Sequence, residues 1–396
     1  MSSPQTAKVP TRSIVLLAGA GFASQAMVRV TDSLLPQIAT DFGTTVGEAS
    51  IVVAAYSVAH GSVQLVIGPV SDRFGKYRTV ALMCAIATVL VALCGIAQSL
   101  PALAIARFAS GAAAGWIIPT SMAYVGDVTP YERRQPILAR YLSGQIIGQL
   151  FGQAAGGVLG DWLGWRHVFF VLAGMFALAT AGLLFELATN PRTRAGRRLD
   201  GRAGGFVADY VAVLSNPWAR VVILAVFIEA SIAWGAFTYV GADLHLRFGL
   251  SFTAIGLIIG TFGVGGLVYA ACVQQFVDLF GQAGLAIFGG ALLGAAYLLL
   301  AIGAAWWIAP IAVAAIGLGF YALHNTLQTN ATQMTPQARA TAVAIFSSMI
   351  YLGQTIGVAA GSVLFDRFGA APLFVIAALA LPALSLWFGR ALRRTR

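Results

Sequence analysis

Four charged side chains lie inside long apolar stretches of this sequence, namely Arg29, Asp32, Arg107 and Glu229. A charge at the centre of a bilayer costs about 2.5–3.5 kcal/mol on insertion scales, so such residues usually face a cavity and take part in transport. A carboxyl group in that setting is suited to loading and releasing a proton. We therefore predict that Asp32 and Glu229 carry protons, and that Arg107 influences the charge state of a nearby carboxylate.

Each of these residues also has a simpler interpretation. Arg29 and Asp32 are three positions apart, so they can neutralise each other on one helix face. Arg107 lies nearer the end of its apolar stretch, from where its side chain can reach the membrane surface. Glu229 has no opposite charge on its own segment and can serve substrate recognition instead.

Uncharged polar residues recur three or four positions apart in five apolar stretches, which places each set on one face of a helix. Lipid cannot hydrogen-bond these groups, so we expect them to face inward, where they either bind substrate or bond neighbouring helices. A histidine among them can titrate near neutral pH, although a lone histidine is more often a satisfied polar contact. With Arg29, the predicted substrate-binding residues are Gln25, Tyr56, His60, Gln64, Gln145, Gln149, Tyr321, His324, Asn325, Gln328, Tyr351 and Gln354.

The composition indicates which elements hold these residues. Of 396 residues, 59% are hydrophobic and 10% are charged, with a mean hydropathy of +0.82. Soluble proteins carry about 45–50% apolar and about 25% charged residues, so a water-soluble enzyme is excluded. Unpaired backbone is prohibitive in lipid, so long apolar runs predict helices. We predict an all-α polytopic membrane protein with twelve transmembrane helices, at about 13–37, 47–70, 77–98, 101–124, 136–160, 166–187, 219–242, 252–275, 283–304, 307–331, 341–364 and 370–391.

The basic residues predict how the chain is oriented. Of 24 Lys and Arg residues, two lie within spans, three (Arg166, Arg247 and Arg367) lie in loops on one side, and 19 lie on the other side. The positive-inside rule then places both termini and the central linker in the cytoplasm. The short loops and the lack of a cleaved leader favour the bacterial inner membrane.

The remaining composition predicts few partners. The formal charge of +10 lies between apolar runs, so we expect no nucleic acid partner. The three cysteines lie in apolar runs without metal-type spacing, and we expect neither a metal nor a cofactor. We expect a monomer whose partners are the lipid bilayer, protons and a small-molecule substrate.

The sequence contains an internal repeat. The segment from Gly152 reads GQAAGGVLGDWLG, and GVAAGSVLFDRFG follows from Gly357 at an offset of 205 residues. Asp72 and Asp278 match at an offset of 206. This pattern predicts two six-helix halves in parallel repeat, with a substrate site near the midplane between them. The predicted domains are an N-terminal bundle (1–189), a cytoplasmic linker (190–218) that includes a short amphipathic helix, and a C-terminal bundle (219–396).

The loop between the second and third spans reads GPVSDRFGKYR from Gly68. It resembles the signature loop of the major facilitator superfamily, of the form G-x-x-x-D-R-x-G-R/K. In that family the aspartate belongs to a cytoplasmic gate between the halves, and the resemblance implies this role for Asp72 and Arg73. The whole gate motif comprises Gly68, Asp72, Arg73, Gly75 and Lys76.

Two further motifs resemble the twelve-span drug/proton antiporter group, which includes sugar-efflux and multidrug-efflux members. Arg107-Phe108-Ala109-Ser110-Gly111 is similar to R-x-x-Q-G, with serine in place of glutamine. The fifth span is similar to the antiporter motif that ends G-P-x-x-G-G, although Gln153 replaces its proline. Small residues at this spacing also permit close helix packing, so a packing role alone stays open. The glycines concerned are Gly148, Gly152, Gly156 and Gly157.

These observations predict a secondary active transporter that exports a small organic solute or drug against proton entry by alternating access. An importer, or an exporter of organic anions or sugars, is the alternative within the same class. An intramembrane enzyme is disfavoured because H-E-x-x-H and G-x-S-x-G motifs are absent from the sequence. A membrane sensor is disfavoured because the loops are short. The substrate, the direction of transport and the proton stoichiometry stay open.

Overall fold

The computed structural model describes residues 10–194 and 205–394, and no strand occurs among them. The first part of the chain forms α1 (Thr11–Arg29), η1 (Val30–Ser33), α2 (Leu35–Phe42), α3 (Val46–Ala49), α4 (Ile51–Gln64), α5 (Ile67–Phe74), α6 (Lys76–Gly95), α7 (Leu100–Ala114), α8 (Ile117–Val128), α9 (Tyr131–Leu163), α10 (Trp165–Thr189) and η2 (Pro191–Arg194). The second part forms α11 (Gly205–Ser215), α12 (Pro217–Phe237), α13 (Val240–Phe248), α14 (Phe252–Ile302), α15 (Ile308–Ala331), η3 (Pro336–Ala338), α16 (Arg339–Phe368) and α17 (Ala371–Arg394).

Nine of the described helices are long and apolar enough to cross a membrane. One of them, α14, holds two of the predicted spans, which meet at Gly281, where the backbone leaves the helical region (φ 61°, ψ 177°). Glycine adopts a positive φ without steric penalty, which permits this reversal. A bend of 110° separates Leu35–Phe42 from Val46–Gln64, and the fifth predicted span lies in α9. All twelve predicted spans therefore fall on helices, and the all-α membrane architecture is confirmed.

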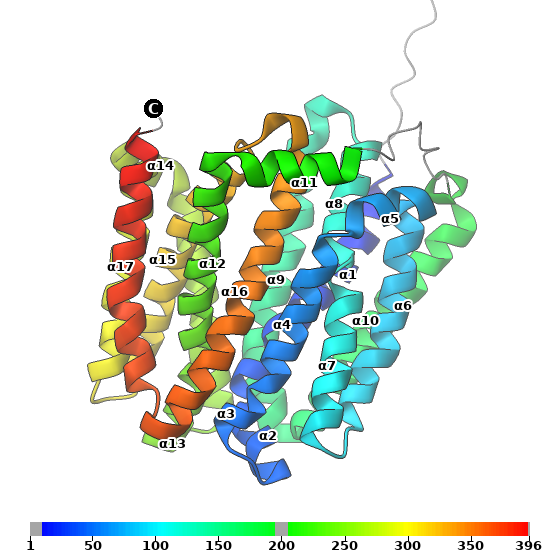
Figure 1. Cartoon of the computed structure of the whole chain (residues 1–396). Helices are drawn as coiled ribbons and strands as arrows, with labels where there is room; N and C mark the ends of the chain where they lie inside the picture. The colour runs from blue at the N-terminus through cyan, green and yellow to red at the C-terminus, as the bar shows by residue number, and fades with distance from the viewer. Residues whose placement is uncertain (1–9, 195–204, 395–396) are drawn as a thin grey trace, which may run out of the picture.

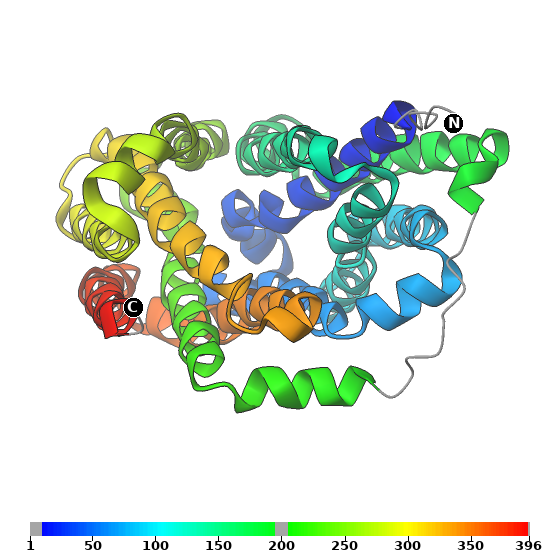
Figure 2. The same cartoon turned by 90° about the horizontal axis from the view of Figure 1, so that it is seen from above.

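The helices form two bundles, which Figure 2 shows along the helix axes. Buried apolar side chains between Leu17 and Leu183 form one core, joined by Val358, and those between Val213 and Leu392 form another. We call α1–α10 the N-terminal half and α12–α17 the C-terminal half. The halves contact each other mainly through two pairs of helices, α4 with α16 and α9 with α14. Two six-helix halves are thus confirmed, while the domain bounds 1–189, 190–218 and 219–396 stay a prediction.

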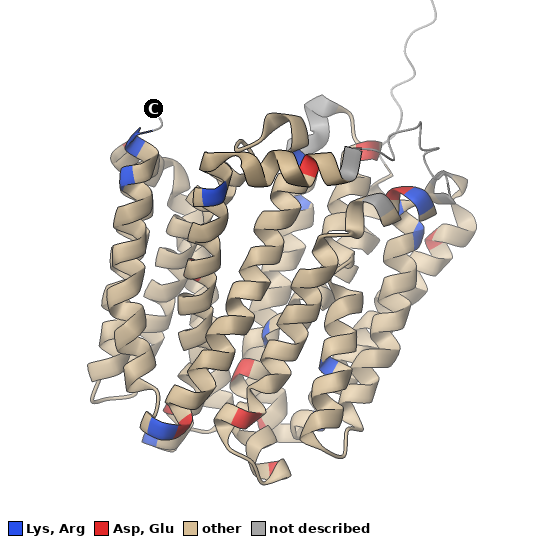
Figure 3. Cartoon of the chain, viewed as in Figure 1, with Lys and Arg blue, Asp and Glu red and all other residues tan. Residues whose placement is uncertain are grey.

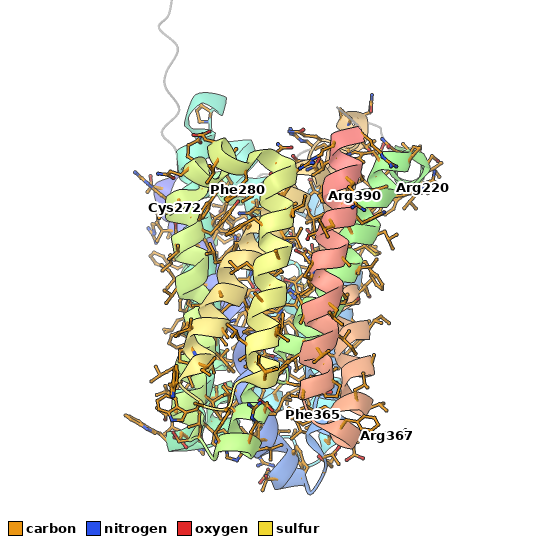
Figure 4. All side chains as sticks on the ribbon, turned by 90° about the vertical axis from the view of Figure 1, so that its left-hand side faces the viewer. Arg220, Cys272, Phe280, Phe365, Arg367 and Arg390 are labelled. Carbon is orange, nitrogen blue, oxygen red and sulfur yellow. The ribbon has the colours of Figure 1, made fainter. Side chains whose placement is uncertain are left out.

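The two ends of the bundle differ. At one end α11 lies across the bundle near α5, and at the other lie α2, α3 and α13 (Figure 1). We call these the α11 end and the α13 end. Arg220 and Arg390 lie at the α11 end, whereas Arg367 lies at the α13 end (Figure 4). The arrangement agrees with the predicted separation of basic residues, although Lys8 and the linker arginines at 195–204 lie outside the described residues.

Helix α11 is the linker helix that the sequence predicts, and it contacts both halves. Val213 of α11 is buried in the core of the C-terminal half, and Asn216, which follows α11 and caps α12, donates a side-chain hydrogen bond to the Met334 carbonyl at 2.6 Å. The Tyr210 hydroxyl donates to the Leu65 carbonyl of the N-terminal half at 2.5 Å. Burial raises the pKa of this hydroxyl, so it remains a protonated donor at neutral pH.

Candidate functional site

The first buried ion pair lies where α1 ends. After Arg29 the helix tightens into the 3-10 turn η1, which carries Asp32, and α2 then begins at Leu35 with Pro36 in its first turn. Both charged side chains are buried, and Arg29 Nη1 lies 3.4 Å from Asp32 Oδ2. The neutralising pair that the spacing permits is therefore present. A 3-10 turn within a longer helix often marks a functional hinge, and this one holds the carboxylate.

Arg29 also reaches the C-terminal half. Its Nη2 donates a hydrogen bond to Gln354 Oε1 on α16 at 3.2 Å. Its guanidinium lies over the Trp234 ring on α12, 3.5 Å from the ring centroid. A desolvated cation–π contact contributes about 2 kcal/mol. One side chain of the N-terminal half thus contacts a carboxylate of its own half together with an amide and an indole of the other half.

The second buried carboxylate, Glu229, pairs with a histidine. Glu229 lies on α12 and His324 on α15, and His324 Nδ1 lies 2.8 Å from Glu229 Oε2. Phe320 stacks on the imidazole with ring centroids 4.8 Å apart. Both residues were predicted separately, and the structure brings them together as an acid and a base in one apolar setting.

Several buried polar atoms of the predicted site residues have no hydrogen-bond partner among the described residues. They include Asp32 Oδ1, Glu229 Oε1, Gln354 Nε2 and His60 Nδ1. Buried polar groups in proteins are nearly always bonded to protein or to ordered water. A proton or an ordered water molecule is the simplest partner for such fully buried atoms.

Arg107 forms a separate site inside the N-terminal half. It is fully buried on α7, where its Nε donates to the Val52 carbonyl at 3.1 Å and its Nη1 to the Met27 carbonyl at 3.2 Å. Its guanidinium lies 4.2 Å from the centroid of the Tyr56 ring. No described carboxylate forms an ion pair with it. The idea that Arg107 reaches the membrane surface is wrong, because main-chain carbonyls hold its charge in the core.

His60 and Tyr351 bring the halves together between α4 and α16. Their ring centroids lie 4.2 Å apart, and the Tyr56 ring lies 5.5 Å from His60. A Cβ added to Gly61 would approach Tyr351 Cβ to 2.8 Å, so only glycine permits this closeness. These two predicted residues lie at the contact between the halves.

The remaining predicted polar residues vary in burial. Gln64 and Gln145 are buried, and Gln25, Gln149, Tyr321 and Asn325 are partly buried. Gln328 is exposed near the end of α15, which differs from the inward position predicted for it. It lies one turn beyond His324, where α15 approaches the α11 end.

Sequence reasoning missed an aromatic cluster in the C-terminal half. The Trp234 ring contacts Phe237, Phe262 and Phe320, with ring centroids 4.7–5.5 Å apart. Tyr321 adjoins it, 5.9 Å from Phe262. In a sequence, an aromatic residue within an apolar run is interpreted as part of the hydrophobic core. The one feature that could have indicated a role for Trp234 is its position five residues after Glu229.

The gate motif lies at the α11 end and contacts its own half. Lys76 Nζ lies 3.2 Å from Asp72 Oδ1 and 2.5 Å from Asp127 Oδ2 on α8. Gly75 has a positive φ of 89° and makes the turn between α5 and α6. Gly68 and Arg73 are exposed. The predicted contact of Asp72 with the other half is not among the contacts of the described residues.

The antiporter-type glycines serve helix packing. A Cβ added to Gly148, Gly152 or Gly156 of α9 would lie 2.2–2.5 Å from main-chain oxygens of α1 and η1. A Cβ on Gly157 would lie 2.2 Å from the Phe252 oxygen of α14. Small residues let helix backbones approach closely in membranes. The packing interpretation therefore accounts for this stripe, which fixes α1, and with it Arg29, against α9.

The arrangement provides two buried carboxyl groups inside an apolar bundle, one paired with a guanidinium and one with an imidazole. Figure 3 shows that charged residues gather at the two ends, with few between them. No group of three or more His, Cys, Asp or Glu side chains suited to a metal ion occurs in residues 10–194 and 205–394. Chemically, the carboxyl, guanidinium and imidazole groups of these pairs can form ion pairs and hydrogen bonds.

Known proteins resemble this chain in sequence and in fold. YceJ of Bacillus subtilis, an uncharacterised MFS-type transporter, is 25% identical over 85% of this chain and 86% of its own length. The multidrug export protein EmrB of Haemophilus influenzae is 32% identical, over 36% of this chain and 28% of EmrB.

Two solved structures share the fold. The nucleoside transporter NupG gives a TM-score of 0.79 at 13% identity, over 96% of this chain and 99% of that one. A bacterial homologue of the human lysosomal transporter Spinster, in an inward-facing and unoccupied conformation, gives 0.68 at 17% identity, over 99% and 96%. The sequence model of the family described as Major Facilitator Superfamily matches residues 17–339 of this chain, and a second match covers residues 225–396. The chain therefore belongs to the Major Facilitator Superfamily of membrane transporters.

Proposed function

We propose that this transporter exports a small organic solute or drug in exchange for protons. The observation that carries the proposal is the pair of buried carboxylates, Asp32 with Arg29 and Glu229 with His324, one on each half of the molecule. Intramembrane carboxylates are costly to retain and usually mark proton or substrate pathways. As a member of a transporter family, the chain is not an enzyme.

Coupling follows from competition for the same charges. A proton on Asp32 removes the anion that holds Arg29, and the guanidinium then depends on Gln354 and Trp234 of the other half. Protonation changes the affinity of these groups for substrate. By reciprocal linkage, bound substrate changes their affinity for the proton by the same factor. In this scheme Glu229 and His324 form the second proton site.

The proposed orientation and membrane are supported by the distribution of basic residues and by the similar proteins. The α11 end carries the basic residues, so the proposed orientation places it, with both termini, in the cytoplasm. YceJ and EmrB belong to bacteria, which supports a bacterial inner membrane. EmrB is a multidrug export protein, and this similarity supports export of drugs.

A flux assay with imposed pH gradients tests the proposal. A survival panel of drugs and metabolites in a host without its own efflux pumps supplies the transported compound, and purified protein in proteoliposomes then moves it under a proton gradient. Asp32→Asn and Glu229→Gln should each abolish gradient-driven flux. Asp41→Asn is the matched control, since Asp41 pairs with Arg166 and Trp165 within one half and should leave flux intact. Unaltered gradient-driven flux in both site variants would refute proton coupling at these residues.

Export of an organic anion is the second candidate, and Arg107 favours it. The interior of the N-terminal half holds two arginines and one aspartate, because Arg107 has carbonyl rather than carboxylate partners. A substrate carboxylate near Arg29 would balance the excess positive charge. The survival panel separates the candidates, because protection against anionic rather than cationic compounds would favour this one.

A further inference from the structure

Two carboxylates join the halves at the α13 end. Asp366, on α16 of the C-terminal half, accepts hydrogen bonds from Thr45 Oγ1 at 2.6 Å and from the Gly47 amide at 2.8 Å. Asp161, on α9 of the N-terminal half, accepts from Thr253 Oγ1 at 2.7 Å and from the Thr253 amide at 3.2 Å. Each carboxylate therefore binds the first turn of a helix that belongs to the opposite half.

The two contacts are related by the internal repeat. Asp161 and Asp366 are 205 residues apart, and the amides that they bind, Gly47 and Thr253, are 206 apart. The residues that cap the two helices correspond as well: the side chain of Thr45 accepts from the amide three residues later, and so does the side chain of Ser251. One structural device thus occurs twice, once in each direction across the interface.

The surroundings of both contacts require close approach. A Cβ on Gly47 would lie 2.2 Å from an Asp366 carboxylate oxygen. A Cβ on Gly157, one turn before Asp161, would lie 2.2 Å from the Phe252 oxygen. Nearby, the Tyr239 hydroxyl of the C-terminal half donates to the Val358 carbonyl and lies 2.9 Å from Ser50 Oγ of the N-terminal half. The interface between the two halves is therefore closed at the α13 end.

From this geometry we infer that Asp161 and Asp366 are paired positioning residues that hold the α13 end shut in one state of the transport cycle. The inference rests on the alternating access of the proposed function. An anion at a helix N-terminus is stabilised by the free amides and the helix dipole. Opening the α13 end withdraws each carboxylate from the amide that it binds, so both contacts are lost together.

The expected size of the effect is moderate. A side chain that bonds a free amide in the first turn of a helix, as an N-cap does, typically shifts an equilibrium by about fivefold, so losing both contacts shifts it by about 25-fold. Both carboxylates are exposed, which places each effect toward the lower part of the range. Because the two states of a transporter differ by little free energy, a shift of this size changes which state predominates.

Pulsed electron paramagnetic resonance on the full chain in nanodiscs tests the inference. Spin labels replace Thr40 and Leu246 at the α13 end, and in a second sample Arg78 and Gln337 at the α11 end, in a background where Cys84, Cys94 and Cys272 are alanine. Combined Asp161→Ala and Asp366→Ala substitutions should lengthen the distance at the α13 end and shorten the distance at the α11 end. Either single substitution should give the same changes in a smaller population.

Two further variants keep the result interpretable. Asp41→Asn removes an exposed carboxylate at the same end whose partners lie within one half, so both distances should match the parent protein. Gly47→Ala displaces Asp366 sterically and keeps every charge, so it should act like the carboxylate variants, and it replaces them if the double variant does not fold.

The readout separates this inference from the proposed function. A loss of thermal stability with unchanged distances at both ends would mean that the carboxylates are merely structural and would overturn the inference. Distances that move in opposite directions, together with flux that ignores the pH gradient, would sustain the inference and refute proton coupling. Distances that stay fixed in the carboxylate variants, together with flux that the pH gradient drives, would overturn the inference and sustain proton coupling.

Discussion

At the scale of single residues, Arg29 is the side chain on which the site depends. It contacts Asp32 in its own half and Gln354 and Trp234 in the other. The sequence placed Arg29 and Asp32 on one helix, because a spacing of three is a local property. The partners of Arg29 on α12 and α16 depend on how the helices are rotated and packed. A local sequence pattern carries no information on that packing.

The pair can be tested by changing its members separately and together. Breaking a buried ion pair by removing one partner typically costs about 3–5 kcal/mol, because the other charge is left uncompensated, whereas replacing both is often neutral. Asp32→Asn and Arg29→Gln should therefore each lower the thermal midpoint of the detergent-solubilised protein more than the double variant does. Additive losses would show that the two residues do not act as a pair.

At the scale of elements, the α1–α9 contact positions the site. Three glycines of α9 face main-chain oxygens of α1 and η1, so the register of these helices fixes where Arg29 and Asp32 lie. The glycine spacing predicts close packing, but the partner helix could not be read from it, because any neighbour with small residues would fit. The same limit applies to Glu229 and His324, which are 95 residues apart and meet only through the packing of α12 and α15.

Replacing one of these glycines should separate the helices. In Gly152→Ala the new methyl group would lie 2.2 Å from the Ala26 oxygen, so α1 must shift. We expect a thermal midpoint several degrees lower, because overpacking typically costs about 1–3 kcal/mol. Gly174→Ala is the control: a Cβ there has no neighbour within 4 Å, and alanine favours the helix by about 1 kcal/mol. Equal behaviour of the two variants would contradict the packing role.

At the scale of the whole molecule, most of the architecture could be predicted from the sequence. Apolar length and the repeat predicted twelve helical segments in two halves, since lipid excludes other backbone structures. The halves' relative placement could not be predicted. Asp161 and Asp366 were evident as a repeat, yet their contacts across the interface depend on which helices face each other.

The interface predicts that the halves stay together when the linker is cut. A protease site inserted between Arg194 and Gly205 should yield two fragments that co-purify in mild detergent, because α4 packs on α16 and α9 on α14. Gly157→Leu, which crowds the Phe252 oxygen, should increase dissociation of the cut protein. Complete separation of the fragments without that substitution would argue that the linker alone holds the halves.

The carbonyl-bound Arg107 has an electrical consequence. With Arg29 and Asp32 it gives the interior of the N-terminal half one excess positive charge, and a proton on Asp32 makes the excess two. Moving one elementary charge across the full membrane potential involves about 2.3 kcal/mol per 100 mV. Any tilt of this half through the bilayer's electric field therefore makes the cycle sensitive to voltage, and more so in the protonated form.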